Sequence, residues 1–341
     1  MTVLGVTCLR DEGPYIVDWL AHHRALGFAG FVIVTHDCAD GADTLLDVLD
    51  AGGAVTHVPF RPKGDKTVQW QALRLVDRHP RVRAADRVLF FDVDEYLNLP
   101  EPMKTVGDLV AACGAPDAIS VPWRLFGSAQ ETYEDRPVTE RFTRCAPRGL
   151  HYPLAHLFKT ICRPRAFQKL GVHRPRLKKD TAVDWRLADG AALLRAEEPR
   201  IITAYGQPGF GQVMPVLNHY SVRSAEEFVM KGRRGLPNHA DRPVDLSYWA
   251  ERNWCAEIDT SIARFATRVN EERNFIMGLP GVSEAHSTSV TWHQNRIAEA
   301  RADIEVERMI WRLGLLAGST PPPAARTRAF IAAQLKARAD G

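Results

Sequence analysis

Short apolar runs alternate with amphipathic stretches over the first 125 residues. The apolar runs have the length and composition of buried strands, and they lie at residues 3–8, 31–34, 54–58, 88–91 and 118–121. Between them, apolar residues recur at helical spacing, which predicts helices at residues 14–26, 43–49, 67–76 and 105–113. Strands that alternate with helices indicate an α/β fold with a mostly parallel sheet covered on both faces.

The predicted helices carry local start and stop signals. Pro14 suits a first helical turn, and Gly27 follows the last periodic residue. Thr105 with Asp108 three residues later resembles a capping box.

The pattern changes after residue 125. Residues 126–215 hold many prolines and arginines between short apolar pieces, which predicts short strands and long loops. Helical periodicity then dominates, and we expect helices at residues 225–231, 247–275, 291–316 and 326–338, with a proline-rich linker at 319–323.

Composition excludes several classes of protein. The 341 residues are 45% hydrophobic and 25% charged, a globular balance, and the net charge of +3 argues against nucleic-acid binding. There is no apolar run of membrane-spanning length and no leader-like amino terminus. The six scattered cysteines form no C-x-x-C pair, which favours reduced thiols over a zinc site. We expect a cytoplasmic protein, with peripheral attachment to the inner membrane as the alternative.

Asp92 and Asp94 carry the sharpest chemical signal. They directly follow the apolar run 88–91, and residues i and i+2 of a strand point the same way. Ligands bind at the carboxyl ends of strands in open α/β sheets, and two adjacent carboxylates suit Mg²⁺ or Mn²⁺. The motif predicts a metal site, and the alternative is a solvated acidic turn.

Two further loops follow early strands. Asp37 follows the run 31–34, where a carboxylate can accept hydrogen bonds from a ribose or a base. The alternative is a turn in which Asp40 or Asp43 caps the next helix. Glu12 follows the first strand, where a nucleotide could dock. The alternative is a loop whose acidic residues favour the start of a helix through the helix dipole.

A later segment combines an imidazole with cations. His219 is a candidate metal ligand, and Lys231 with Arg234 are candidates for pairing with phosphate oxygens. The alternative is a core histidine and a solvated basic helix end. Glycines at 232 and 235 also suggest a lid that closes over a ligand.

These segments together resemble the bacterial family-2-like glycosyltransferases, in the branch related to family 92 galactosyltransferases. The resemblance covers roughly residues 3–236, and its motifs are Arg10–Pro14, Trp19–Arg24, Asp37–Gly41, Phe91–Leu97, Trp123–Ser128, Lys159–Ile161, and His219–Tyr220 with Ser224–Lys231. The family usually has Lys-Asn where this chain has Arg10-Asp11, and often Thr or Ser where it has Ala42.

The resemblance implies a Rossmann-like GT-A fold at residues 1–236, with a nucleotide-sugar half at 1–125 and an acceptor half at 126–236. Residues 237–341 would form a helical carboxyl-terminal region. It also implies that Asp92 and Asp94 hold a metal ion and the donor phosphates, that Glu12 and Asp37 lie near the nucleoside, and that Gln71 makes a polar donor contact.

We therefore expect metal-dependent transfer of a sugar, with a hexose favoured, from a nucleotide sugar to a hydroxyl, with inversion. The acceptor would be a glycan, a lipid-linked molecule or a protein, as in polysaccharide biosynthesis. Lys159 joins Lys231 and Arg234 as a candidate for neutralising the diphosphate, and Asp184 and Glu131 are candidates for the general base. The alternatives are a non-catalytic scaffold of the same fold and a nucleotidyltransferase.

Overall fold

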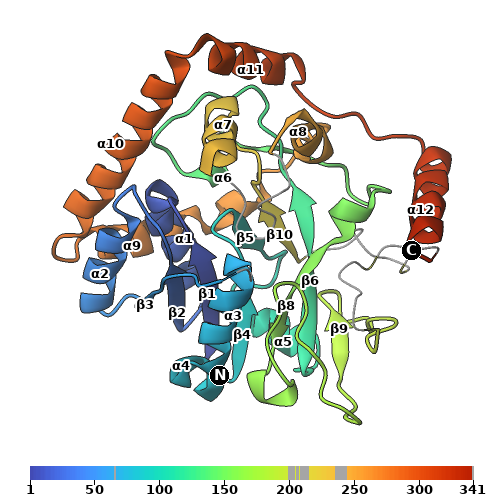
Figure 1. Cartoon of the computed structure of the whole chain (residues 1–341). Helices are drawn as coiled ribbons and strands as arrows, with labels where there is room; N and C mark the ends of the chain where they lie inside the picture. Colours follow the sequence, from blue (N-terminus) through green and yellow to red (C-terminus); the bar gives the residue numbers. More distant parts are fainter. Residues whose placement is uncertain (65–66, 199–203, 205–206, 208–214, 235–243, 340–341) are drawn as a thin grey trace.

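The computed structural model describes residues 1–64, 67–198, 204, 207, 215–234 and 244–339, with side chains through residue 333 (Figure 1). Its main sheet has nine strands in the order β3-β2-β1-β4-β8-β6-β10-β5, with β9 also paired to β6. The strands are β1 Val3–Leu9, β2 Gly30–Thr35, β3 Thr56–Pro59, β4 Arg87–Phe90, β5 Glu95–Asn98, β6 Ala118–Leu125, β8 Phe158–Cys162, β9 Trp185–Leu187 and β10 Val216–His219. β8 runs antiparallel to β4 and β6, and β5 runs antiparallel to β10, while the other pairings are parallel. The expected α/β class with a largely parallel sheet is confirmed.

Alternate side chains of the central strands enter two cores, one on each face of the sheet. Phe31 and Ile33 of β2 belong to the core that includes α1 (Gly13–Ala25), α2 (Ala42–Ala51) and α5 (Val106–Ala112). Val32 and Val34 belong to the opposite core, with α3 (Val68–Arg78) and α4 (Pro80–Ala84). Both faces are therefore apolar, which explains why the strand sequences are continuously apolar rather than alternating.

Two of the carboxyl-terminal helices pack on the amino-terminal ones. The remaining helices are α6 Val138–Arg141, α7 Ala225–Arg234, α8 Leu246–Arg252, α9 Ala266–Met277, α10 Val282–Arg301, α11 Ile304–Leu315 and α12 Ala324–Ala339. In Figure 1, α9 and α10 lie against α1 and α2, and α11 lies beside α7. Ile276 and Val282 enter the same core as α1. The expected boundary between residues 236 and 237 stays a prediction. In the described part of the chain, no helix has the length and apolarity needed to span a bilayer.

The two long helices expected at 247–275 and 291–316 are wrong as single helices. α8 ends at Arg252, and the Asn253 side chain accepts a hydrogen bond from Ser128 N (2.7 Å) and donates one to Leu316 O (2.7 Å). The following segment places β11 (Glu257–Ile258) beside β7 (Arg144–Cys145). These long-range contacts outweigh local helical periodicity. Asp303 breaks the second helix because it caps α11, accepting a hydrogen bond from Glu305 N.

The capping box expected at Thr105 is confirmed, and a second one begins α7. Thr105 and Asp108 form a reciprocal capping box at the start of α5. Ser224 Oγ accepts a hydrogen bond from Glu227 N (3.2 Å), and Glu227 Oε2 accepts one from Ser224 N (3.1 Å). The lid expected at residues 231–240 is corrected in its first part, because the residues up to Arg234 belong to α7. Residues 235–240 lie outside the described residues.

The capping box of α5 provides a test of the fold. We expect Thr105→Ala to lower the free energy of unfolding by about 1 kcal/mol, because Asp108 N loses its acceptor. The matched control is Thr67→Ala, since Thr67 precedes α3 without a side-chain capping bond. Urea titrations would measure both variants, and equal destabilisation would contradict the capping role.

Candidate active site

Several of the candidate residues gather at one edge of the sheet. Because β1, β2, β4, β6 and β10 are mutually parallel, their carboxyl ends share this edge. Glu12, Asp37, Asp92 and His219 all lie at or just beyond the ends of these strands.

The Asp-x-Asp segment is a tight turn rather than an extension of β4. Glu95 N donates to Asp92 O (3.0 Å), and Asp92 N donates to the Glu95 carboxylate (3.0 Å). β5 then begins at Glu95 and returns antiparallel to β10. The strand alternation that suggested a shared direction for Asp92 and Asp94 therefore does not apply, and the two carboxylates have different partners.

Asp94 lies between α7 and β10. Lys231 Nζ donates to Asp94 Oδ2 at 3.0 Å, and His219 Nε2 lies 3.5 Å from Asp94 Oδ1. That second distance is long for a hydrogen bond, and Asp94 Oδ1 is buried without a hydrogen-bond partner among the described residues. Burial opposes the charge of Asp94, but Lys231 and His219 outweigh it and hold the pKa of the carboxyl well below its usual range.

The imidazole of His219 is held in its neutral form. Burial lowers the pKa of His219, although Asp94 acts in the opposite direction. The ring packs 4.1 Å from the ring of Trp123, measured between centroids. A neutral imidazole beside an anionic carboxylate is a pair of ligands that a divalent cation can use.

Asp92 pairs with a buried lysine on β8. Lys159 Nζ lies 3.0 Å from Asp92 Oδ2 and 3.6 Å from Glu95 Oε1, and its side chain is 0% exposed. Burial disfavours the ammonium, but Asp92 and Glu95 outweigh it and raise the pKa of Lys159. Burial raises the pKa of Glu95 well above its usual range, and Lys159 opposes this shift. Lys159 thus holds the turn in place through its contacts with Asp92 and Glu95.

Glu12 is surrounded by arginines. Arg234 Nη1 lies 2.6 Å from Glu12 Oε1, and Arg223 Nη1 donates to Glu12 Oε2 at 3.1 Å. Although burial acts against the carboxylate, Arg234 and Arg223 lower the pKa of Glu12. The structure therefore brings Glu12 and Arg234 close to Asp94 and Lys231, and Glu12 is engaged in ion pairs.

Arg223 is a residue that the sequence analysis missed. Its backbone has φ 52°, an uncommon conformation for a residue with a side chain, and its guanidinium lies 3.5 Å from the ring centroid of Tyr15. Its Nε and Nη2 are buried without hydrogen-bond partners among the described residues. No sequence signal distinguishes this arginine from an exposed one, because its contacts come from residues more than 200 positions away.

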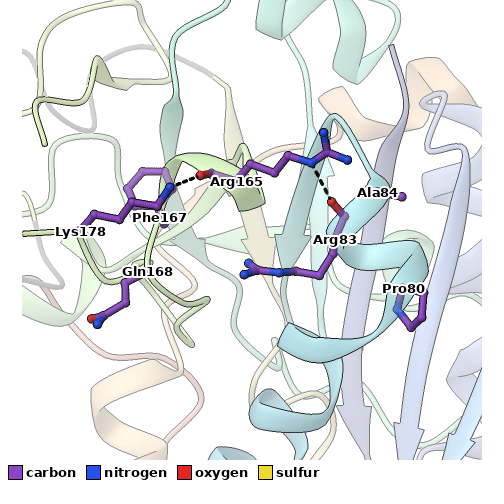
Figure 2. A pocket seen from close by; sticks show the side chains of 7 residues that line it. All are labelled: Pro80, Arg83, Ala84, Arg165, Phe167, Gln168 and Lys178. Carbon is purple, nitrogen blue, oxygen red and sulfur yellow. Dashed lines mark hydrogen bonds between the residues drawn. The ribbon is translucent and has the colours of Figure 1, made fainter.

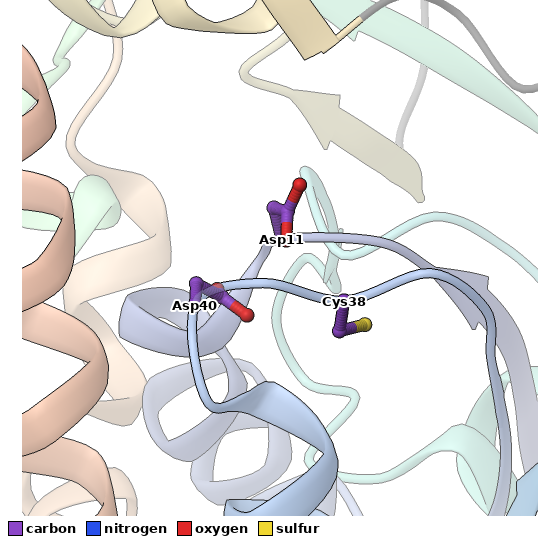
Figure 3. A group of neighbouring side chains, drawn as sticks. All are labelled: Asp11, Cys38 and Asp40. Atoms are coloured by element: carbon purple, nitrogen blue, oxygen red, sulfur yellow. The ribbon is translucent and has the colours of Figure 1, made fainter.

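Asp11, Cys38 and Asp40 form a second cluster with ligand atoms within 4.8 Å of one another (Figure 3). Asp11 Oδ1 accepts from Ala39 N (2.6 Å), and Asp40 Oδ2 accepts from Gly13 N (2.7 Å). Asp40 Oδ1 also accepts a hydrogen bond from a backbone N–H at the start of α2, as the capping alternative expected. Burial raises the pKa of the Cys38 thiol, which disfavours the thiolate that a metal requires. This cluster joins two loops.

Asp37 and Gln71 make contacts different from those of Glu12. Asp37 has φ 47°, and its carboxylate is 59% exposed beside His36 Nδ1 at 3.2 Å. Gln71 lies on α3, where its Oε1 accepts from Lys63 N at 2.9 Å in the loop after β3.

The two general-base candidates have different locations. The expectation of Asp184 as a general base is corrected, because the residue lies at the opposite edge of the sheet. Its backbone pairs with Asp117 at the start of β6, and its carboxylate pairs with Arg186. Sequence proximity to a strand could not reveal which end of the sheet it would occupy. Glu131 lies in the loop after β6, on the edge that carries Asp94.

Comparison with known proteins identifies a family for the amino-terminal part of the chain. The model of glycosyltransferase family 92 matches residues 9–189. No curated protein matches the chain. Among solved structures, S. aureus TarS 1-349, alone and in complex with UDP, aligns at 14% identity and TM-score 0.32, over 55% of this chain and 60% of that chain. HddC from Yersinia pseudotuberculosis aligns at 7% identity and TM-score 0.30, over 55% of this chain and 89% of that chain. The alignment thus spans less than two thirds of TarS 1-349.

The buried lysine provides a test of the site geometry. We expect Lys159→Met to lower the free energy of unfolding by about 1.5–3 kcal/mol, because the turn loses the charged hydrogen bond between Lys159 and Asp92. The double variant Lys159→Met/Asp92→Asn should regain part of this loss, because it also removes the carboxylate that Lys159 neutralises. Lys179→Met, at an exposed lysine, is the control. Denaturant titrations in which the first and last variants behave alike would contradict the role of Lys159.

Proposed function

Because the chain belongs to glycosyltransferase family 92, we propose that it transfers a sugar from a nucleoside-diphosphate donor to an acceptor hydroxyl, with inversion and with a divalent cation at Asp94 and His219. One observation carries this proposal. Asp94 is buried, one of its oxygens pairs with Lys231, and the other has no hydrogen-bond partner among the described residues and faces His219.

The residues present fit a cation. Asp94 Oδ1 and the His219 imidazole would hold it, and the nitrogen ligand favours a transition-metal ion such as Mn²⁺ over Mg²⁺, which takes mostly oxygens. When bound, the cation would neutralise charge on the departing diphosphate. Asp92, which pairs with Lys159, would shape the turn and the local charge.

The side-chain charges at this edge already balance in pairs. Lys231 matches Asp94, Lys159 matches Asp92, and Arg234 matches Glu12. A diphosphate would therefore bring charge that these pairs do not neutralise, which supports a requirement for a cation. Arg223 would contribute as well, because its Nε and Nη2 are buried donors without described partners.

The acceptor hydroxyl of a glycan, a lipid-linked molecule or a protein would need a base whose pKa is close to the working pH. His173 lies near the site, 5.5 Å from the Trp123 ring, but burial and Lys159 lower its pKa to about 3, so it is a weak base. Glu131 remains the candidate at this edge.

We assign the nucleoside to the end of β2. Asp37 is exposed there, just past the strand end at the same edge as Asp94. Asp40 is buried, and its carboxylate accepts backbone hydrogen bonds. Glu12 would position Arg223 and Arg234 rather than contact the base.

The metal requirement can be tested by release of nucleotide from a panel of nucleotide sugars with Mn²⁺. We expect Asp94→Asn to lower kcat/KM about 100-fold or more and His219→Ala to lower it at least about tenfold, because each removes a proposed ligand. Asp184→Asn, at the far edge, should leave turnover unchanged.

Excess EDTA should abolish wild-type turnover, and added Mn²⁺ should restore it. Full turnover in EDTA would refute the cation, while the family activity would still stand.

The nucleoside assignment has a separate test. We expect Asp37→Ala to raise the Kd for UDP or GDP about tenfold without changing Tm, because its carboxylate is exposed and makes few internal contacts. Asp50→Ala, an exposed carboxylate at the other end of α2, is the control. Calorimetry that finds unaltered nucleotide affinity in the first variant would overturn the assignment.

A further inference from the structure

Two adjoining cavities lie at the edge of the sheet opposite Asp94. One has a volume of about 600 Å³ and the other about 450 Å³, and both are lined by Ala84 and Arg165. They lie where α4 leads into β4 and where η2 (Pro164–Ala166) follows β8, at the amino ends of the parallel strands. Figure 2 shows the lining of the larger cavity.

Basic side chains dominate both linings. Arg83 and Lys178 line the larger cavity, Arg87 and Arg163 line the smaller one, and Arg165 lines both. These five cations face a single lining carboxylate, Asp86, which already accepts hydrogen bonds from Thr2 N (2.7 Å) and Thr2 Oγ1 (3.2 Å).

Neutral backbone oxygens hold several of these cations. Lys178 Nζ donates to Arg165 O (2.6 Å), Arg165 Nε donates to Arg83 O (3.2 Å), and Arg83 Nη1 donates to Pro164 O (3.3 Å). The first two bonds are drawn in Figure 2. Carbonyl oxygens orient the cations but do not neutralise them. The carboxylates of Asp77 and Asp117 approach Arg83 and Arg163 only to 3.8 Å.

Arg87 is the second, independent feature. Arg87 is one of the residues that line the smaller cavity, it is only 2% exposed, and its Nη1 has no hydrogen-bond partner among the described residues. A buried guanidinium nitrogen without an acceptor costs free energy that an anionic ligand would recover.

We propose that these two cavities form a binding site for a phosphate group, distinct from the site of sugar transfer. A phosphate dianion offers several acceptor oxygens with a charge that matches converging guanidinium groups. Four residues of extended strand separate Lys159 from Arg163, a distance of about 13 Å. A phosphate here therefore lies beyond the reach of the proposed donor site. The group is carried by a free phosphate compound or by an anionic lipid headgroup.

The first arm of the test measures inorganic phosphate by calorimetry at constant ionic strength. Wild-type protein should bind it, and Arg165→Gln and Lys178→Gln should each raise the Kd about tenfold. Arg296→Gln, which removes an exposed arginine on α10, is the matched control and should bind like wild type. Lys231→Gln should also retain this binding, because Lys231 lies at the other edge.

The second arm measures flotation with phosphatidylcholine vesicles that contain or lack phosphatidic acid. Selective flotation that Arg165→Gln and Lys178→Gln both lose, with no binding of inorganic phosphate, identifies the lipid as the source. Phosphate binding without flotation identifies a soluble ligand. The proposal is overturned if wild-type protein binds in neither arm, or if the two cavity variants bind as wild type does. Loss of binding in Lys231→Gln alone would also overturn it, by placing the phosphate at the donor edge.

Discussion

The buried carboxylate of Asp94 is the constraint on which the candidate site depends. A carboxylate in a water-poor position needs compensating charge, and here the charge comes from Lys231 on α7, with the imidazole of His219 on β10 beside the other oxygen. Meeting that need brings the turn after β4, the end of β10 and the last turn of α7 to one place. The oxygen of Asp94 that has no hydrogen-bond partner among the described residues gives this arrangement its proposed capacity for a cation.

The carboxyl-terminal helices support the same edge. His293 on α10 lies 3.2 Å from Asp40, and that carboxylate also accepts the backbone N–H of Gly13. A Cβ at Gly13 would lie 2.4 Å from Ser289 Oγ, so only glycine permits α10 to approach this closely. α10 therefore holds in place the loops to which we assign the nucleoside.

The two edges of the sheet differ in how their charges are balanced. At the carboxyl edge, cations and carboxylates pair directly, as Lys159 does with Asp92. At the amino edge, Arg165 and Lys178 bond to neutral backbone oxygens and retain their charge. A paired set suits a ligand that arrives with its own cation, whereas an unpaired basic set suits an anion alone.

Sequence alone was sufficient for the alternation of strands and helices, the α5 capping box and the identity of the Asp92–Asp94 motif, because these follow from local periodicity and short-range hydrogen bonds. The three-dimensional fold was needed to show that Asp92 and Asp94 occupy a turn with separate partners, that Arg223 joins them, and that Asp184 lies at the opposite edge. It also interrupted the expected helix at 247–275. The physical reason is the same in each case: these features depend on buried contacts between residues far apart in the chain, and local patterns carry no information about such contacts.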